Sequence, residues 1–210
     1  MKKAFVLVVL FILPLVAYLF FASGVNNFGR LPILTENVPD VSIISNDNTF
    51  KEKITILNFL GNDVSYVKGN VFNLHQKIYK RFYEFHDFQM IIVAPLGSEE
   101  KVEELKEELG ELADIRKWNF VFGNPEQIRT LFNGLKTDLT LNENLANPNA
   151  FIIDKLGNLR GRDDDEDTVV KYGFNTVSVA DLNNKMEDDV KIILAEYRLA
   201  LKKNNANRSK

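Results

Sequence analysis

Short apolar runs that alternate with amphipathic segments are the feature that most limits how this chain can fold. Residues 54–60 and 88–94 are almost entirely apolar and are bounded by polar residues, as buried strands are. The segment between them, residues 69–86, repeats an apolar side chain at helical spacing, at Val71, Leu74, Ile78 and Phe82. A strand, a helix and a second strand in this order predict a sheet covered by helices, an α/β fold.

The rest of the chain continues this alternation within one predicted domain, residues 38–203. Ser98 is expected to cap a helix that ends near residue 112, and Ser178 is expected to cap a long C-terminal helix. The other predicted elements are strands at 118–122, 151–154 and 158–162, a helix at 125–135, and an N-terminal hairpin made from 31–34 and 41–44.

The N-terminal segment has the composition of a membrane anchor. Lys2 and Lys3 precede an unbroken apolar run over residues 4–22, which as a helix spans roughly 28 Å, close to the hydrocarbon core of a bilayer. The bulky pair Phe20-Phe21 favours an anchor over a cleaved signal peptide, although the small residues of Ala22-Ser23-Gly24 keep cleavage open. Residues 1–22 are therefore predicted to be a single transmembrane helix, with the N-terminus in the cytoplasm and the rest outside.

The remaining composition excludes several function classes. The formal net charge of −3 lacks the basic excess of a nucleic-acid-binding protein. The chain has no cysteine, so it forms no disulfide and offers no thiolate for disulfide exchange or for binding Cu(I). Without disulfides, the domain must rely on its own hydrophobic core for stability. Residues 23–37 are predicted to be a polar tether and residues 204–210 a polar tail.

The order of the predicted elements resembles the thioredoxin fold, and one stretch carries the likeness most clearly. Residues 147–159, N-P-N-A-F-I-I-D-K-L-G-N-L, are similar to the stretch of thioredoxin-like proteins in which a cis-proline precedes a strand that ends in an Asp-x-x-Gly turn. The resemblance implies a central mixed sheet flanked by helices, behind the transmembrane helix. It also implies a cis peptide bond before Pro148.

A second stretch resembles a narrower family. Residues 118–131, W-N-F-V-F-G-N-P-E-Q-I-R-T-L, match the W-x-F-x-x-G-x-x-E-x-I-x-x-L segment of the Sco/SenC family, the membrane-tethered copper chaperones of cytochrome oxidase, and residues 159–163 are similar as well. This resemblance covers about residues 38–197. With the anchor, it implies a single-pass protein of the bacterial inner membrane whose domain lies in the periplasm.

The copper site of that family does not carry over to this chain. Its C-x-x-x-C motif aligns with residues 63–67, and its histidine aligns with Asn147-Pro148, so all three ligands are absent. Asp63 offers one hard carboxylate beside Val67 and Pro148, which does not suit a soft metal. By resemblance the chain is a degenerate member with no catalytic residue, metal site or cofactor.

The remaining polar candidates are expected to have structural roles. His75 and His86 are expected to be partly exposed on one helix, roughly 16 Å apart, too far to share a metal ion. The acidic run over residues 163–167 lacks the spacing of a calcium loop and predicts a solvated loop. Asp63 is expected to serve as a helix N-cap or loop residue rather than as an acid or base.

Two functions remain open at this stage. The first is a tethered, non-redox binding or assembly module for an envelope protein, with respiratory oxidase subunits as candidate partners. Its partner surface is predicted from the degenerate active-site loop and the proline that faces it: Asp63, Val64, Ser65, Tyr66, Val67 and Pro148. The second is a copper-handling factor in oxidase maturation that uses a rebuilt site without thiols.

The absence of cysteine leads to a direct biochemical expectation. The domain should show no disulfide reductase or isomerase activity under any redox condition, because no other side chain replaces the thiolate in disulfide exchange. Reduction of insulin and reactivation of scrambled ribonuclease are suitable assays, and turnover above a buffer control in a pure preparation would contradict the non-redox interpretation.

Overall fold

The strand predicted over residues 54–60 lies in the middle of the central sheet of a computed structural model, which describes residues 9–16, 18 and 29–208. This strand, β2 (Ile54–Leu60), runs parallel to β3 (Phe88–Pro95), which runs parallel to β4 (Trp118–Gly123). On its other side, β2 pairs antiparallel with β5 (Ala146–Ile153). The sheet is therefore mixed, as predicted.

Short strands complete the sheet beyond β5. The pairing order is β1-β6-β5-β2-β3-β4, where β6 is Leu159–Arg160 and β1 is Ile33–Thr35. A further strand, β9 (Phe174–Asn175), also pairs with β5. Between β6 and β9, the strands β7 (Arg162–Asp165) and β8 (Val169–Lys171) form a separate two-stranded hairpin.

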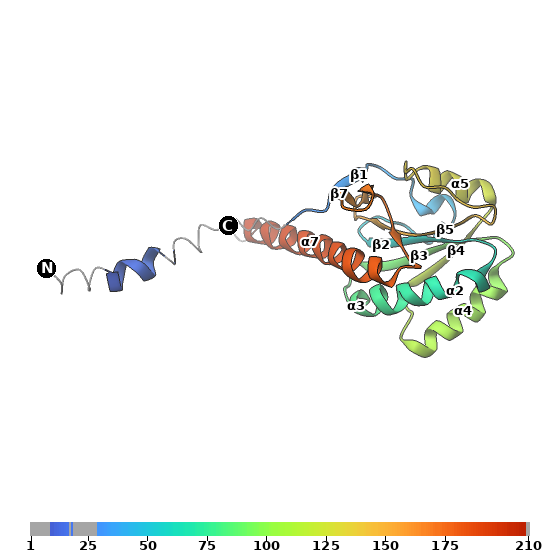
Figure 1. Cartoon of the computed structure of the whole chain (residues 1–210), viewed down its shortest axis with the longest axis horizontal. Helices are drawn as coiled ribbons and strands as arrows, with labels where there is room; N and C mark the ends of the chain where they lie inside the picture. Colours follow the sequence, from blue (N-terminus) through green and yellow to red (C-terminus); the bar gives the residue numbers. More distant parts are fainter. Residues whose placement is uncertain (1–8, 17, 19–28, 209–210) are drawn as a thin grey trace.

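Helices cover both faces of the sheet (Figure 1). One face carries a continuous helix made of α2 (Val64–Leu74), a π-helical turn η2 (His75–Tyr79) and α3 (Lys80–Phe82). The same face carries α4 (Glu99–Leu112) and the C-terminal helix, which consists of α6 (Val179–Asp181), a π-helical turn η3 (Leu182–Met186) and α7 (Glu187–Arg208). The other face carries η1 (Val41–Ile43) and α5 (Pro125–Asn133).

Strand β2 explains why its run of residues is apolar throughout. Ile54 and Ile56 pack in the cluster under α2, α4 and α7, whereas Leu57 and Phe59 pack in the cluster under α5. A strand covered on both faces buries every side chain, so it shows no alternation of polar and apolar residues.

The structure corrects the predicted N-terminal hairpin. Residues 33–35 pair with β6, and residues 41–43 form a 3₁₀ turn rather than a strand. The Asp40 carboxylate accepts hydrogen bonds from the backbone N–H groups of Ser42 and Phe50, both at 2.9 Å, and so stabilises the turn. The sheet thus begins within the segment predicted as a tether.

The predicted helices are present, with some changed ends. The helix expected over residues 69–86 begins earlier, after Asp63, and ends at Phe82. Ser178 caps the C-terminal helix by accepting from the Asp181 N–H at 3.2 Å. The hydroxyl of Ser98 instead donates to the Pro95 carbonyl at 2.6 Å, although α4 does begin after it.

The predicted membrane anchor falls largely outside the described residues. Residues 9–16 are helical, and residues 1–8, 17 and 19–22 are not described. In the described part of the chain, no helix has both the length and the apolar character needed to span a bilayer. The anchor therefore stays a prediction.

One expectation about the histidines is wrong. His86 is exposed as predicted, but the His75 side chain is fully buried, and neither ring nitrogen has a hydrogen-bond partner among the described residues. Its ring stacks on Tyr79 at 5.3 Å and lies 5.9 Å from the Trp118 ring. His75 lies four residues after Val71 and therefore on the apolar face of the helix, which packs on the sheet; the π-helical turn begins at this residue.

Burial of His75 should make the fold sensitive to acid. Burial and the nearby Lys80 lower the pKa of His75 from 6.5 to about 4. Above pH 6.5 the ring is neutral in both the folded and the unfolded chain, and the contribution of His75 to stability is at its maximum. Between pH 6.5 and about 4 the free energy of unfolding should fall by about 1.4 kcal/mol per pH unit, roughly 3 kcal/mol in total, because the unfolded chain takes up a proton that the buried ring does not. Urea unfolding at pH 7, 5.5 and 4 should show this loss in the wild type.

A His75→Phe variant should lose much less stability over the same range, because phenylalanine keeps the stacking and takes up no proton. His86→Gln, at an exposed position, is the matched control and should retain the wild-type pH dependence. Equal acid sensitivity in the wild type and His75→Phe would contradict the assignment to His75.

Candidate functional site

Asp63 begins helix α2 at the end of β2, in the helix-capping role expected from the sequence. Its carboxylate accepts a hydrogen bond from the Tyr66 backbone N–H at 3.2 Å. Val64 is buried, Val67 is half-buried, and Ser65 and Tyr66 are exposed. The predicted loop is thus the first turn of a helix, and two of its side chains point to solvent.

The chain before this turn is held against β5. Gly61 has a φ of +75°, and a Cβ on it would lie 2.6 Å from the Ala146 Cβ and 2.7 Å from the Asn144 carbonyl oxygen. The Asn62 N–H also donates to the Asn144 carbonyl at 2.9 Å. Only glycine allows this close approach, so the start of α2 and the start of β5 lie at the same edge of the sheet.

The expectation of a cis peptide bond before Pro148 is wrong. The described residues contain no cis peptide bond. Pro148 lies inside β5 rather than before it, at an irregularity in the pairing with β2 between Asn58 and Phe59. Its carbonyl accepts from the backbone N–H of Thr176 at 2.8 Å and from the Thr176 hydroxyl at 2.6 Å. Proline has no backbone N–H to donate to a neighbouring strand. It can occupy this strand because the bulge interrupts the regular hydrogen-bond pattern at its position.

The edge of the sheet near Pro148 exposes several apolar side chains. Tyr66 is 85% exposed, Leu96, directly after β3, is 61% exposed, and Val177, directly after Thr176, is 60% exposed. Pro148 is exposed as well. We call these four residues the Pro148 edge. The ends of β2 and β3 and the start of β5 bring them to one end of the sheet, and no hydrogen bond links Pro148 to residues 63–67 within the described chain.

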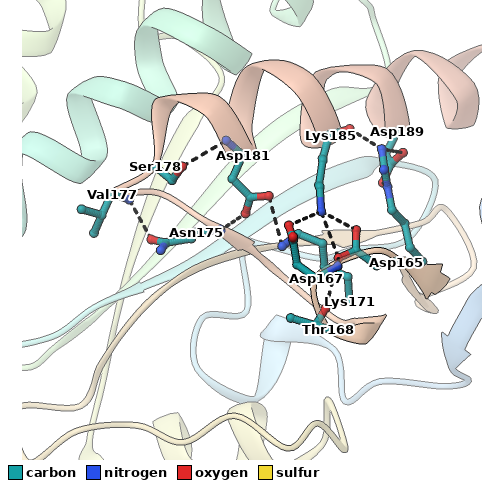
Figure 2. Close-up of polar contacts among 11 residues, drawn as sticks. Asp165, Asp167, Thr168, Lys171, Asn175, Val177, Ser178, Asp181, Lys185 and Asp189 are labelled. Carbon is teal, nitrogen blue, oxygen red and sulfur yellow. Dashed lines mark hydrogen bonds and ion pairs between the residues drawn. The ribbon is translucent and has the colours of Figure 1, made fainter.

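A cleft of about 390 Å³ adjoins the Pro148 edge. Asn175 and Ser178, which flank Thr176 and Val177 in the sequence, line it, and so do Lys171, Asp181 and Lys185. Figure 2 shows side chains from the β7–β8 hairpin and from the C-terminal helix pointing toward one another in this region.

Asp167 of the acidic run lines this cleft and Asp165 is buried beside it, so the expectation of a solvated loop is wrong for Asp165, whereas the other acidic side chains of residues 163–167 are exposed. The Lys185 ammonium lies 2.7 Å from an Asp165 carboxylate oxygen and 2.7 Å from Asp167 (Figure 2). The Asp165 side chain is only 1% exposed. Burial alone raises the pKa of Asp165, but hydrogen bonds from Lys185 and from the Asp167 N–H outweigh it and lower the pKa to about 2.

Two more ion pairs join the hairpin to the C-terminal helix. Arg162 donates twice to the Asp189 carboxylate, at 2.8 Å to each oxygen, and Lys171 lies 3.1 Å from Asp181. Burial raises the pKa of Asp189 even though Arg162 favours its charged form. Each cation of the cleft is matched by a carboxylate, so the network fixes the walls rather than offering an uncompensated charge to a ligand.

Sequence reasoning missed this network because its members lie far apart along the chain. Lys185 and Arg162 are polar residues on elements that each look exposed when taken separately. The available signal was the unusual density of carboxylates over residues 163–167, which required compensating cations from elsewhere.

The acidic residues of this region do not build a metal site. Among the described residues, no group of three or more histidine, aspartate or glutamate side chains is arranged to hold a metal ion. The Asp63 carboxylate is engaged in capping α2.

Comparisons with known proteins identify the fold. No protein-family model and no curated protein matches the chain. Among solved structures, a candidate protein disulfide isomerase from Bacteroides thetaiotaomicron has a TM-score of 0.51 at 14% identity, over 79% of this chain and 94% of its own. The thioredoxin domain of a thiol-disulfide oxidoreductase from Bacteroides vulgatus has a TM-score of 0.42 at 18% identity, over 69% of this chain and 82% of its own.

The soluble domain of Sco1 from Bacillus subtilis is also similar, with a TM-score of 0.45 at 15% identity, over 77% of this chain and 94% of its own. Likeness at these identities concerns the fold alone. The chain has the predicted thioredoxin-like α/β fold, while its sequence lacks the cysteines of the thiol-disulfide enzymes.

The ion-pair network should contribute to stability through its buried member. Lys185→Met should destabilise the chain by about 3 kcal/mol, because it leaves the Asp165 carboxylate buried without its partner. Lys191→Met is the matched control: the Lys191 side chain is 54% exposed in its pairs with Glu187 and Asp188, so its replacement should destabilise the chain far less than Lys185→Met. Urea unfolding of both variants at pH 7 measures the difference, and equal effects would show that the network contributes no more than a surface pair.

Proposed function

We propose that this chain is a membrane-anchored, extracytoplasmic thioredoxin-fold protein without redox activity, which binds a protein of the cell envelope through the Pro148 edge. The observation that carries the proposal is the exposure of Tyr66, Leu96 and Val177 at the end of the sheet where the predicted loop lies. Large apolar side chains that stay exposed at one end of a sheet are candidates for a protein interface.

The charge beside this edge suggests what kind of partner it fits. Helix α4 begins just after Leu96 and carries Glu99 and Glu100 in its first turn. A partner that covers Leu96 therefore also meets negative charge. We expect a segment in which apolar or aromatic side chains are flanked by lysine or arginine.

The adjoining network supports the proposal by making the edge rigid. Val177 follows Asn175, whose side chain accepts from the Val177 N–H at 3.0 Å and whose own N–H donates to Asp181 at 2.7 Å (Figure 2). Asp181 is in turn paired with Lys171. An edge that is ordered before binding loses less conformational entropy when the partner arrives.

Membrane attachment and the bacterial periplasm remain parts of the proposal that rest on the sequence. The apolar run over residues 4–22, after Lys2 and Lys3, supports an anchor with the domain outside the cytoplasm. For the copper-handling alternative, no observation on the described residues favours a site, and we do not propose it.

The proposal predicts that partner binding depends on two exposed side chains. Full-length chain carrying Tyr66→Ser and Leu96→Ser should recover at least about tenfold less of its envelope partner, because each central apolar contact contributes more than about 1 kcal/mol. The measurement is affinity capture from detergent-solubilised membranes, followed by mass spectrometry that includes the respiratory oxidase subunits.

The matched control carries Leu156→Ser and Val169→Ser. These side chains are 74% and 72% exposed but belong to the β5–β6 turn and the β7–β8 hairpin. This variant should capture the partner as the wild type does. Equal recovery with all three proteins would remove the Pro148 edge as the binding surface.

A further inference from the structure

A second concavity lies at the opposite end of the sheet from the Pro148 edge. It has a volume of about 220 Å³ and is formed between the start of β2, the segment before β3 and helix α7. Its apolar wall consists of Ile54, Phe85, Leu194 and Tyr197. Phe85 is 44% exposed, so an apolar surface remains open to whatever enters.

Polar groups converge on one side of this pocket. The His86 ring nitrogen Nδ1 lies 2.6 Å from an Asp87 carboxylate oxygen, and the other oxygen of Asp87 is bonded to the Lys155 ammonium. Lys155 also lies 5.2 Å above the Tyr197 ring. Arg198 lines the pocket and takes part in no ion pair among the described residues.

The charged side chains that line the pocket include one more basic than acidic group. Asp87 is the single carboxylate in the lining, whereas Lys155 and Arg198 supply two basic side chains. Just outside, the Lys117 ammonium is bonded to the Phe85 carbonyl and holds the wall of the pocket in place. Burial and the neighbouring cations Lys53 and Arg116 lower the pKa of Lys117, as expected where positive charges gather. The pocket thus pairs an apolar wall with a cationic rim, which suits an anion carried on an apolar chain.

The N-terminal chain joins the domain beside this pocket. The Leu31 carbonyl accepts from Arg160, and Arg160 also donates to Glu196, the neighbour of Tyr197 in α7. Leu31 lies nine residues after Ala22, the last residue of the predicted anchor. An extended chain of that length spans at most about 30 Å. An anchored domain would therefore be held with this end within reach of the membrane surface.

We propose that this pocket binds the headgroup region of an anionic phospholipid, with Arg198 contacting the charged group and Phe85 and Leu194 contacting the adjoining hydrocarbon. The proposal rests on the membrane anchoring proposed above. We call this concavity the lipid pocket. The two ends of the sheet are thus assigned to different ligands, a protein at the Pro148 edge and the membrane at the lipid pocket. Lipid binding would hold the Pro148 edge facing away from the bilayer.

The experiment uses the full chain in nanodiscs, with hydrogen–deuterium exchange of residues 83–88 and 194–199 as the readout. In discs of phosphatidylcholine with increasing phosphatidylglycerol, exchange in both segments should slow as the anionic lipid increases. Arg198→Gln should need about fivefold more phosphatidylglycerol for half protection, since a cation at an anionic surface contributes roughly 1 kcal/mol. Arg129→Gln, which removes the same charge from the exposed face of α5, is the control and should behave as the wild type.

Other outcomes would overturn the assignment. Equal exchange with and without phosphatidylglycerol would exclude an anionic lipid. Protection by octanoate in discs of phosphatidylcholine alone would identify a soluble anionic amphiphile instead, and protection by inorganic phosphate would indicate charge binding without the apolar wall. A chain that does not enter nanodiscs would contradict the membrane anchoring on which the assignment depends. A chain that inserts but shows no protection at the pocket would contradict the lipid site alone. Neither result affects capture through Tyr66 and Leu96.

Discussion

The buried guanidinium of Arg160 is the interaction on which the arrangement of this domain depends. It is 3% exposed, and it donates to the Asp154 carboxylate at 3.1 Å, to the Leu31 carbonyl at 2.8 Å and to the Glu196 carboxylate at 2.7 Å. A charge removed from water is tolerated only when its donors are satisfied. Arg160 therefore requires the entering chain, the β5–β6 turn and helix α7 to meet at one place.

Helix α7 and the turn before it are held at two points as a result. Arg160 holds Glu196 near one end of the sheet. The ion pairs of Lys185 with Asp165 and of Arg162 with Asp189 hold the first turns of the C-terminal helix against hairpin β7–β8. The first point positions the helix that forms a wall of the lipid pocket, and the second fixes the turn that carries Val177. Both proposed surfaces thus depend on charged pairs between distant segments, in a domain without disulfides.

Much of the fold could be predicted from local signals, whereas the environment of single residues could not. Runs of apolar residues predicted β2 and β3, and Ser178 marked the start of the C-terminal helix, whereas the helix capped by Asp63 begins earlier than the predicted residue 69. His75 was expected to be partly exposed, but it lies four residues after Val71, on the apolar face of the helix, and is buried there. Pro148 was assigned a cis bond by resemblance, but here it lies at a bulge within the strand, where the trans form fits.

The sequence by itself determined the chemistry that is excluded and the order of the elements. A missing side chain cannot be supplied by folding, and the periodicity of apolar residues is local to each element. Tertiary structure alone decided which distant charges became partners and which apolar side chains stayed exposed. Asp165 in the acidic run became buried because Lys185 lies opposite it, and Tyr66 and Leu96 came to one edge because the strands that precede them are parallel neighbours. Such outcomes depend on contacts between segments far apart in the chain, which no local pattern encodes.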